Sequence, residues 1–187
     1  CLAIAPNAQS FLLGADYWLR LFDRSGKELW KAAIPGVAWD VNISGDGRLA
    51  VGAFGDGTIR WYRMADGKEL LAFFPHKNRK RWALWTPNGY YDCSPGAEDL
   101  IGWHVNNGKD QSADFFPAGR FRGLYYRPDV ISRVLEAGDE AIALRQADEE
   151  AGRKRQESDL KKRLPPVIDI LSPAYGSEIR TATFVVR

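Results

Sequence analysis

Cysteine is scarce in this chain, and its scarcity argues against two classes of protein. Only Cys1 and Cys93 occur among the 187 residues, too few for a disulfide framework and without the spacing of a metal-binding motif. The apolar run of about 18 residues that a membrane-spanning helix needs is also missing. No signal peptide is visible, and because the chain starts inside a repeated unit we interpret it as a piece of a longer protein.

An excess of charge of either sign is missing as well. Lysine and arginine total 26 against 24 acidic residues, a formal charge of +2, which predicts no strong attraction to nucleic acid or to an anionic membrane. No cofactor or metal is expected. Apolar residues make up 45% and aromatic residues 12% of the chain, enough for a packed core. Trp61, Trp85 and Trp103 fall inside repeated units, which favours sheet layers filled by aromatic rings.

The sequence does contain a motif that is repeated about every forty residues. The copies occupy residues 4–29, 43–70 and, in degenerate form, 85–109. Residues 19–22 fall on residues 59–62 with a shift of 40, and residues 43–47 fall on residues 85–89 with a shift of 42. A period of this length is typical of repeat proteins, so the question becomes what a repeat array holds or binds.

Each unit has the pattern of short strands joined by tight turns. In the second copy, turns at residues 44–47, 55–57 and 66–67 are rich in Gly and Asp, which tolerate positive φ. Between the turns, residues 49–53 and 58–62 have the apolar and alternating patterns of strands. Four short strands per unit predict an all-β fold, a partial β-propeller with two clear blades and a degenerate third.

These residues resemble the WD40 propeller family over about residues 1–110. The turn at residues 44–47, the strand ending at Gly52-Ala53, the turn at Asp56-Gly57 and the strand at residues 59–62 carry the resemblance. The family's Gly-His pair is missing, and Trp61-Tyr62 stands where Trp-Asp is expected. We therefore expect the blades to lack the hydrogen-bonded His-Asp arrangement of that family.

Three further segments follow the expected propeller blades of residues 1–110. Residues 111–136 are expected to be an irregular aromatic segment and a short helix, begun at Pro128, that pack on the last blade. After Gly138 a charged helix is expected from Asp139 to Arg163, so residues 137–164 are interpreted as a helical linker. Residues 165–187 begin with Pro165-Pro166 and look like the first strands of an immunoglobulin-like β-sandwich.

The junction between these segments resembles a second family. Residues 85–92, 100–106, 113–118 and 126–131 are similar, in this order, to bacterial WD40-repeat proteins that continue into a caspase-like (peptidase C14) domain. The resemblance implies the order propeller, helical spacer, β-sandwich and protease. It places the protease and its catalytic Cys and His outside this chain.

Two functions are consistent with this reading. The first is a non-catalytic protein-interaction or scaffold segment, in which propeller loops bind a protein partner and present it to a caspase-like effector outside the chain. The segment is also expected to associate with other chains through the unpaired edge strands of its blades. The alternative is a regulatory or inhibitory segment of a caspase-like cysteine protease precursor. No nucleic acid or membrane partner is expected, and the sequence assigns no catalytic, cofactor-binding or metal residue.

Several residues have a chemical interpretation beside a structural one. Cys93 with His76 or His104 could form a Cys–His nucleophilic pair, but no caspase-type signature surrounds Cys93, so a small buried residue is favoured. Among acidic residues, Asp92, Glu98 and Asp99 could act as general acid and base, although turn and loop positions are favoured.

Basic and aromatic residues have similar alternatives. The basic stretch of residues 76–81, followed by Trp82, could contact phosphate, although a solvated loop between blades is favoured. Residues 55–57 are interpreted as a turn and not as a phosphate cradle, because no helix follows them. Ligand-lining or layer-filling roles are open for three tryptophans, with layer filling favoured: Trp18, Trp30 and Trp39.

Overall fold

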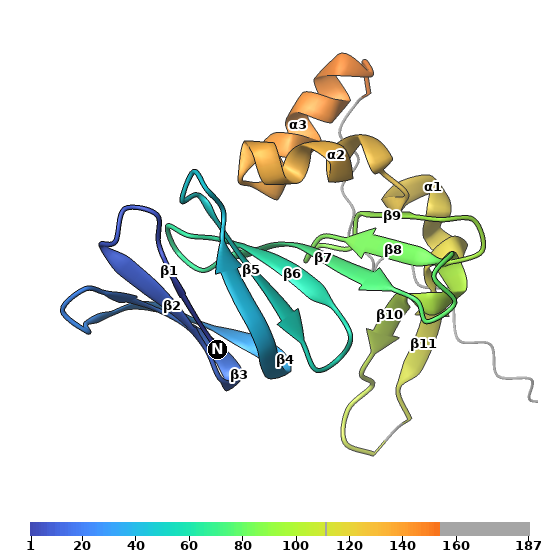
Figure 1. Cartoon of the computed structure of the whole chain (residues 1–187). Coiled ribbons are helices and arrows are strands. Elements are labelled where there is room, and N and C mark those ends of the chain that lie inside the picture. Colours follow the sequence, from blue (N-terminus) through green and yellow to red (C-terminus); the bar gives the residue numbers. More distant parts are fainter. Residues whose placement is uncertain (111, 154–187) are drawn as a thin grey trace, which may run out of the picture. The chain divides into compact units, whose positions relative to one another are not determined.

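A computed structural model describes residues 1–110 and 112–153 of the chain. Nine antiparallel strands form one sheet in which each strand pairs with its neighbours in the sequence (Figure 1). These strands are β1 (Leu2–Ile4), β2 (Ser10–Gly14), β3 (Asp16–Asp23), β4 (Glu28–Ile43), β5 (Leu49–Phe54), β6 (Ile59–Arg63), β7 (Glu69–Pro75), β8 (Trp82–Trp85) and β9 (Tyr91–Cys93). The all-β class predicted from the repeats is confirmed.

The long strand β4 divides the sheet into two four-stranded blades. Its first part pairs with β3 up to Val37, and its second part pairs with β5 from Ala38 onward. Gly36, with φ of 90°, lies just before this change of partner. The first blade is therefore β1, β2, β3 and the first part of β4, and the second blade is the rest of β4 with β5, β6 and β7. Both clear repeats of the sequence form four-stranded blades of a partial propeller, as predicted.

Aspartates close the hairpin turns that the repeats share. The Asp46 carboxylate accepts a hydrogen bond from the Ser44 hydroxyl at 2.5 Å and another from the Arg48 amide at 3.0 Å. Asp56 accepts from the Thr58 amide at 2.9 Å and from its hydroxyl at 2.6 Å. Because a side-chain oxygen satisfies the turn amides, these Asp residues set the turns without help from neighbouring elements.

The core lies between the two blades. Its buried side chains come from both of them: Leu12, Leu19, Leu21, Val41, Ala50, Phe54 and Tyr62. Trp30 packs against this cluster, and its indole Nε1–H donates to the Met64 carbonyl at 2.7 Å. Trp30 thus fills the layer between blades, as predicted. Trp18 and Trp39, which are 37% and 70% exposed, do not lie in the layer between these two blades.

The degenerate third copy is divided between two sheets. β8 and β9 extend the sheet of the second blade, because Ala72 and Phe73 of β7 pair with β6 on one side and with β8 on the other. The next strand, β10 (Gly102–Val105), pairs instead with β11 (Asp114–Pro117) in a separate two-stranded sheet. The third copy therefore adds a hairpin to the second blade and does not form four strands of its own.

The segment after the blades is more regular than the sequence predicts. Besides β11 it contains η2 (Ala118–Phe121), α1 (Arg122–Tyr125) and α2 (Pro128–Ala137), while η1 (Glu98–Leu100) precedes β10. β11 has no strand-like alternation of its own and is stabilised by pairing with β10. α2 packs on β7 and β9, which brings this segment back onto the extended second blade.

The second helix is shorter than predicted. α2 begins at Pro128 and ends before Gly138, as the sequence indicates, but α3 (Glu140–Glu150) ends well before Arg163. Gly152, with φ of 62°, takes the left-handed conformation that ends helices. Acid–base pairs join the two helices, since Arg133 contacts Glu150 and Arg153 contacts Asp129. The rest of the predicted linker and the immunoglobulin-like segment lie outside the described residues, and the segment boundaries stay predictions.

Candidate protein-interaction site

One face of the extended second blade carries a line of aromatic side chains. Ala72 pairs with Trp85, Phe74 pairs with Ala83, and Trp85 also pairs with Tyr91. Because cross-strand partners point to the same face of a sheet, Phe74, Trp85 and Tyr91 share one face. Small alanines occupy the positions between the two large rings. Because side chains alternate between the two faces of each strand, these aromatic rings form one continuous surface on this face of the sheet.

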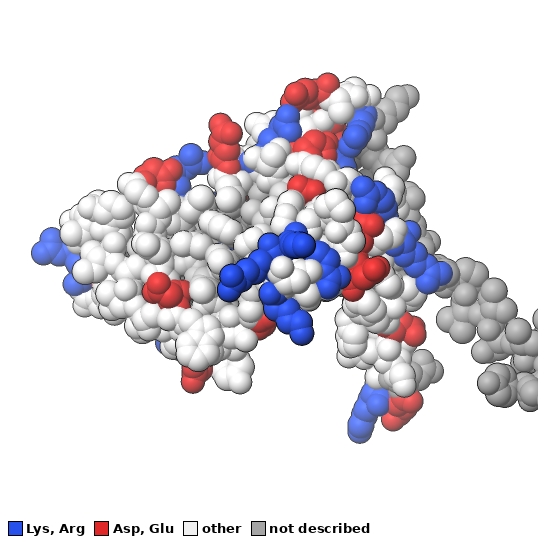
Figure 2. Space-filling model, turned by 45° about the vertical axis from the view of Figure 1, so that its right-hand side comes forward, with Lys and Arg blue, Asp and Glu red and all other residues white. Residues whose placement is uncertain are grey.

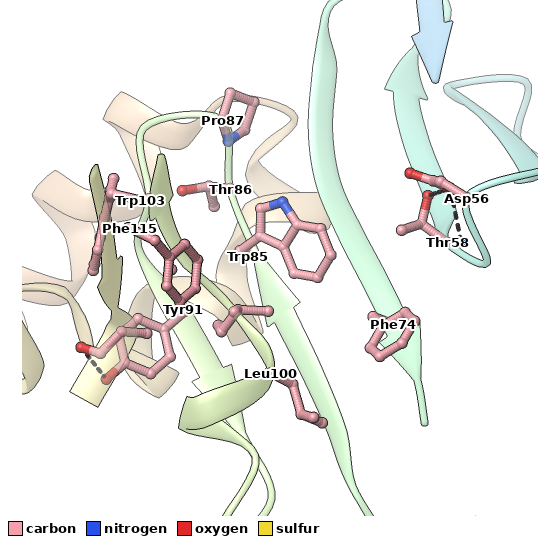
Figure 3. A pocket seen from close by; sticks show the side chains of 14 residues that line it. Asp56, Thr58, Phe74, Trp85, Thr86, Pro87, Tyr91, Leu100, Trp103 and Phe115 are labelled. Carbon is pink, nitrogen blue, oxygen red and sulfur yellow. Dashed lines mark hydrogen bonds between the residues drawn. The ribbon is translucent and has the colours of Figure 1, made fainter. Parts of the chain in front are cut away.

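A second set of residues lies beside this aromatic surface, and the space between the two is a groove. This second set, the wall of the groove, belongs to η1 and the β10–β11 hairpin, which contribute Leu100, Trp103 and Phe115. The space enclosed is about 490 Å³, and Figure 3 shows Trp85 between Phe115 on one side and Phe74 on the other. We call this space the aromatic groove. Phe115 is 56% exposed, so an apolar ring stands at its opening.

Two contacts fix the wall. Trp103 packs on Tyr125 and Phe121, with ring centroids 4.8 and 5.3 Å apart. At Gly102 a Cβ atom would lie 2.4 Å from the Phe116 carbonyl oxygen and 2.7 Å from the Phe115 ring. Only glycine permits this close approach, so Gly102 is what lets the Phe115 ring lie against β10.

Two polar side chains of the groove, Tyr91 and Asp56, have partners within the protein. The Tyr91 hydroxyl lies 3.2 Å from Glu98 and 3.3 Å from the Ala118 carbonyl, and burial, followed by the Glu98 charge, raises the pKa of this phenol. At the other end the Asp56 carboxylate pairs with Arg60 at 2.9 Å. Since these groups are satisfied within the protein, the groove offers apolar surface to a ligand.

A basic loop continues the β7 strand beyond Phe74. Asn78 accepts from the amides of Lys80 at 3.0 Å and Arg81 at 2.9 Å, and Arg79 has a φ of 58°. The loop is thus held by its own turn, as the favoured interpretation expects. Lys77, Arg79 and Lys80 are exposed, and Figure 2 shows Lys and Arg side chains gathered closely on one face of the described chain.

The nucleophilic interpretation of Cys93 has no support. Cys93 is buried in β9, and burial, followed by the charges of Glu98 and Asp92, raises the pKa of its thiol to about 11. A nucleophilic thiol needs a lowered pKa. His76 contacts Arg81 at 3.3 Å, and His104 is exposed on β10.

The acidic candidates also have structural roles. Asp92 accepts from the Cys93 amide at 2.8 Å, Asp99 is exposed, and Glu98 holds Tyr91 and Arg122. Residues 55–57 form the β5–β6 turn, as favoured. In the place of a His-Asp contact, Asp56 of this turn bonds to Thr58 and Arg60.

Trp18 and Trp39 are exposed on the blades. The Lys31 ammonium lies 5.0 Å from the centre of the Trp18 ring, a cation–π contact within the first blade. Neither tryptophan lines the aromatic groove. Trp85 and Trp103, which the repeats place inside the third copy, do line it.

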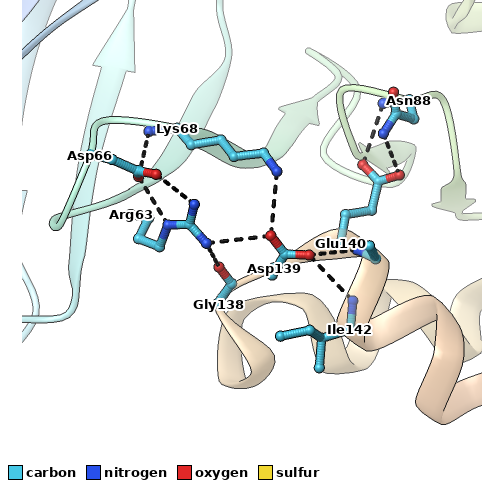
Figure 4. Close-up of polar contacts among 9 residues, drawn as sticks. Arg63, Asp66, Lys68, Asn88, Gly138, Asp139, Glu140 and Ile142 are labelled. Atoms are coloured by element: carbon cyan, nitrogen blue, oxygen red, sulfur yellow. Dashed lines mark hydrogen bonds and ion pairs between the residues drawn. The ribbon is translucent and has the colours of Figure 1, made fainter.

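A second feature is the contact between the second blade and the α2–α3 helical hairpin (Figure 4). Arg63 donates to the Gly138 carbonyl at 2.9 Å and pairs with Asp139 at 3.4 Å, and Lys68 pairs with Asp139 at 3.4 Å. Asp139 is also the N-cap of α3, accepting from the Ala141 amide at 2.8 Å. One carboxylate therefore starts the helix and attaches it to the blade.

The same hairpin is fixed at two further points. Glu140 is 6% exposed, and its carboxylate accepts from the Asn88 side chain at 2.9 Å and from the Asn88 amide at 3.4 Å. Arg48 donates to the Glu136 carbonyl at 2.7 Å. The contacts come from both the second and the third copies of the repeat. We call these contacts, together with those of Arg63 and Lys68, the docking network.

Comparison with known proteins gives a weak likeness. No protein-family model matches the chain, and neither does any curated protein. Solved structures with similarity include RRP9 WD40 repeats (17% identity, 46% of this chain and 34% of that chain, TM-score 0.39) and U3-55K (17%, 51% and 38%, 0.39). BamB from Moraxella catarrhalis is a third (14%, 50% and 33%, 0.37). The chain thus spans about a third of the length of these structures.

Among residues 1–110 and 112–153, no helix is both long and apolar enough to cross a membrane. Within the same residues, no group of three or more His, Cys, Asp and Glu side chains is placed to hold a metal ion.

Sequence patterns did not assign two groove residues, Phe115 and Leu100, to a binding site. Phe115 and Leu100 belong to motifs that the family resemblance singles out, but no periodicity assigns them to a wall. Their position depends on the pairing of β10 with β11, which joins residues across a loop. The available signal was the local excess of aromatic residues near Phe115.

Proposed function

We propose that this chain is a non-catalytic protein-interaction and scaffold segment of a larger propeller protein. The aromatic groove carries the proposal, because it combines about 490 Å³ of space, apolar walls and a 56% exposed phenylalanine. Grooves of this kind bury large side chains of a partner, which provide most of the binding energy in protein complexes. The partner is a protein, and it binds through the groove and the loops beside it.

The docking network supports a further part of the proposal, in which partner binding is passed to an effector. Arg63, Asp139 and Glu140 fix the helical hairpin to the blade that also carries the groove. An attachment of this kind holds the helical hairpin on the blade that carries the groove.

The effector that we propose is a caspase-like protease domain outside this chain. The ordered motifs at residues 85–92, 100–106, 113–118 and 126–131 motivate this assignment. The parent sequence beyond Arg187 tests it directly. A Cys–His protease domain there would support the coupling, whereas a stop codon soon after the proposed β-sandwich would remove it.

A pull-down tests the interaction role. The complete parent protein is immobilised under conditions in which it is active, and retained proteins are identified. We expect a retained partner that is lost with Phe115→Ser but kept with the control Tyr17→Ser, because Tyr17 is 66% exposed on the first blade, away from the groove. Retention of no partner, or equal retention by both variants, would count against the proposal.

A further inference from the structure

The aromatic groove and the basic loop form one continuous surface. Phe74 lines the groove, and its ring lies 6.4 Å from the His76 ring, centroid to centroid, in an edge contact. The loop of residues 76–81 begins at that point, and Arg81 closes it by donating to the Gly96 carbonyl at 3.4 Å. Gly96 precedes η1, which provides Leu100 to the groove wall. One end of the groove therefore opens beside the loop.

The loop presents unpaired positive charge at this end. Within the described residues, no acidic side chain forms an ion pair with Lys77, Arg79 or Lys80. All three are exposed, and the Asn78 turn holds the backbone that carries them. By contrast, Asp56, which lines the groove, and Glu98, which bonds to the groove residue Tyr91, are paired with arginines. The loop therefore adds three positive charges without an ion-pair partner to this end of the groove, more than the single exposed carboxylate of Asp99 on η1.

Resting on the proposed function, we propose that this surface binds an acidic segment of a protein partner, with large apolar side chains in the groove and carboxylates at the loop. Extended chain advances about 3.3 Å per residue, so apolar and acidic residues two to four positions apart reach both parts. In such a complex, the partner's carboxylates complement the positive charge of the loop, and its apolar side chains are buried in the groove.

A nucleic acid fits this surface less well. Its affinity comes mainly from many phosphate contacts, whereas the surface has a single short basic loop on a chain of formal charge +2. Most of the side chains that line the groove are also apolar, and its Tyr91 hydroxyl and Asp56 carboxylate are bonded within the protein. A peptide supplies apolar side chains that remove this surface from water.

Fluorescence anisotropy with three labelled probes tests the inference on the full chain. The first probe is a 12-residue peptide with three glutamates and two phenylalanines in a serine background, the second replaces the glutamates by lysines, and the third is a 12-nucleotide oligothymidine. We expect the glutamate peptide to bind about tenfold or more tightly than the lysine peptide, with an affinity that falls as salt rises. Equal affinity of the two peptides, or preference for the oligonucleotide, would overturn the inference.

Charge-reversal variants locate the binding. Lys77→Glu with Lys80→Glu should weaken the glutamate peptide about tenfold, since two exposed contacts become repulsive. The matched control is Arg24→Glu with Lys27→Glu, the same reversal in the β3–β4 turn, and should change affinity less than about twofold. Phe115→Ser should also weaken binding. An unchanged affinity in the Lys77 and Lys80 variant would overturn the proposed role of the loop.

The parent pull-down separates this inference from the proposed function. A partner whose retention needs Phe115 but is indifferent to Lys77 and Lys80 would leave the interaction role standing and overturn the acidic specificity. Failure to retain any partner would overturn the interaction role itself.

Discussion

Single residues at the interface between the blades set how closely they approach. Gly67 has a φ of 71°, and a Cβ atom there would lie 2.6 Å from the Trp30 ring. Trp30 in turn is fixed by its hydrogen bond to the Met64 carbonyl. The turn glycine of one blade therefore accommodates the tryptophan of the other.

This close approach gives a stability prediction. Gly67→Ala should lower the free energy of unfolding by about 2–4 kcal/mol, because it combines positive-φ strain with a clash against Trp30. Gly26→Ala is the matched control, since Gly26 has a φ of 86° and nothing within 4 Å of the added Cβ. It should cost about 1 kcal/mol, the backbone strain alone. Urea denaturation of both variants measures the difference, and equal losses would contradict the interface role of Gly67.

Thiol reactivity gives a second prediction at the residue scale. Because burial raises the pKa of Cys93 to about 11, little thiolate is present at pH 8, whereas Cys1 is exposed. Iodoacetamide should label Cys1 much faster than Cys93 in the folded chain, with equal rates after unfolding in urea. Mass spectrometry of the two peptides measures this, and equal labelling in the folded chain would restore the nucleophilic interpretation.

Among the elements, the helical hairpin is attached to the second blade by packing of α2 on β7 and β9 and by polar contacts of Asp139. Asp139 has two roles there, since its side chain caps α3 and pairs with Arg63 and Lys68. Burial alone would raise its pKa, but the hydrogen bonds from the Ile142 and Ala141 amides and the Lys68 contact outweigh burial, and the pKa is lowered. The carboxylate form is the one that the structure stabilises.

Two substitutions separate these roles. Asp139→Asn keeps a capping oxygen but loses the charge, whereas Asp139→Ala loses both. We expect Asp139→Ala to destabilise the chain by about 1 kcal/mol more than Asp139→Asn, which itself costs about 0.5–1 kcal/mol. Chemical denaturation followed by circular dichroism measures both. Equal losses would show that the cap contributes nothing.

Acid stability of the hairpin depends on Asp129. Its hydrogen bonds with Arg127, at 2.8–3.1 Å, are the main reason that the Asp129 pKa is lowered. A carboxyl whose folded pKa lies below its unfolded value near 3.8 adds stability above that value, and this stability is lost as the pH falls through the folded pKa. The free energy of unfolding should therefore fall below about pH 4.

The control for this prediction is Asp129→Asn. It should be less stable than the wild type at pH 7 and should lose less stability between pH 5 and pH 3, because it has no carboxylate to protonate. Parallel pH profiles for the two proteins would contradict the assignment.

Elements were predictable from sequence where local patterns decide them. The Gly- and Asp-rich turns fix the hairpins of both clear blades, and Pro128 and Gly138 mark both ends of α2. Elements that depend on contacts with other parts of the chain were not predictable from the sequence. β11 is a strand because β10 lies beside it, and α3 ends at Glu150 although acid–base spacing continues beyond that residue. Acid–base pairs four residues apart are compatible with a helix, but here Glu150 and Arg153 form ion pairs with Arg133 and Asp129 of α2 instead.

For the whole molecule, the sequence predicted the repeated architecture better than the site. Repetition specifies two four-stranded blades, since each unit carries its own turns and strands. The groove arises where the third copy departs from the repeat: β8 and β9 extend the second blade, and the β10–β11 hairpin stands beside it. Since Phe115 is brought to Trp85 only by this departure, no feature of the repeats could reveal the groove.

The most direct test of the proposed interaction role is photocrosslinking at position 115 of the complete parent protein. Benzoylphenylalanine replaces Phe115 at the groove opening, or Tyr17 on the first blade as a control, and illumination is followed by identification of crosslinked peptides. We predict a crosslink from position 115 to a protein partner, at an acidic segment with large apolar side chains, that position 17 does not form. No partner crosslink from position 115, or the same crosslinks from both positions, would contradict the account.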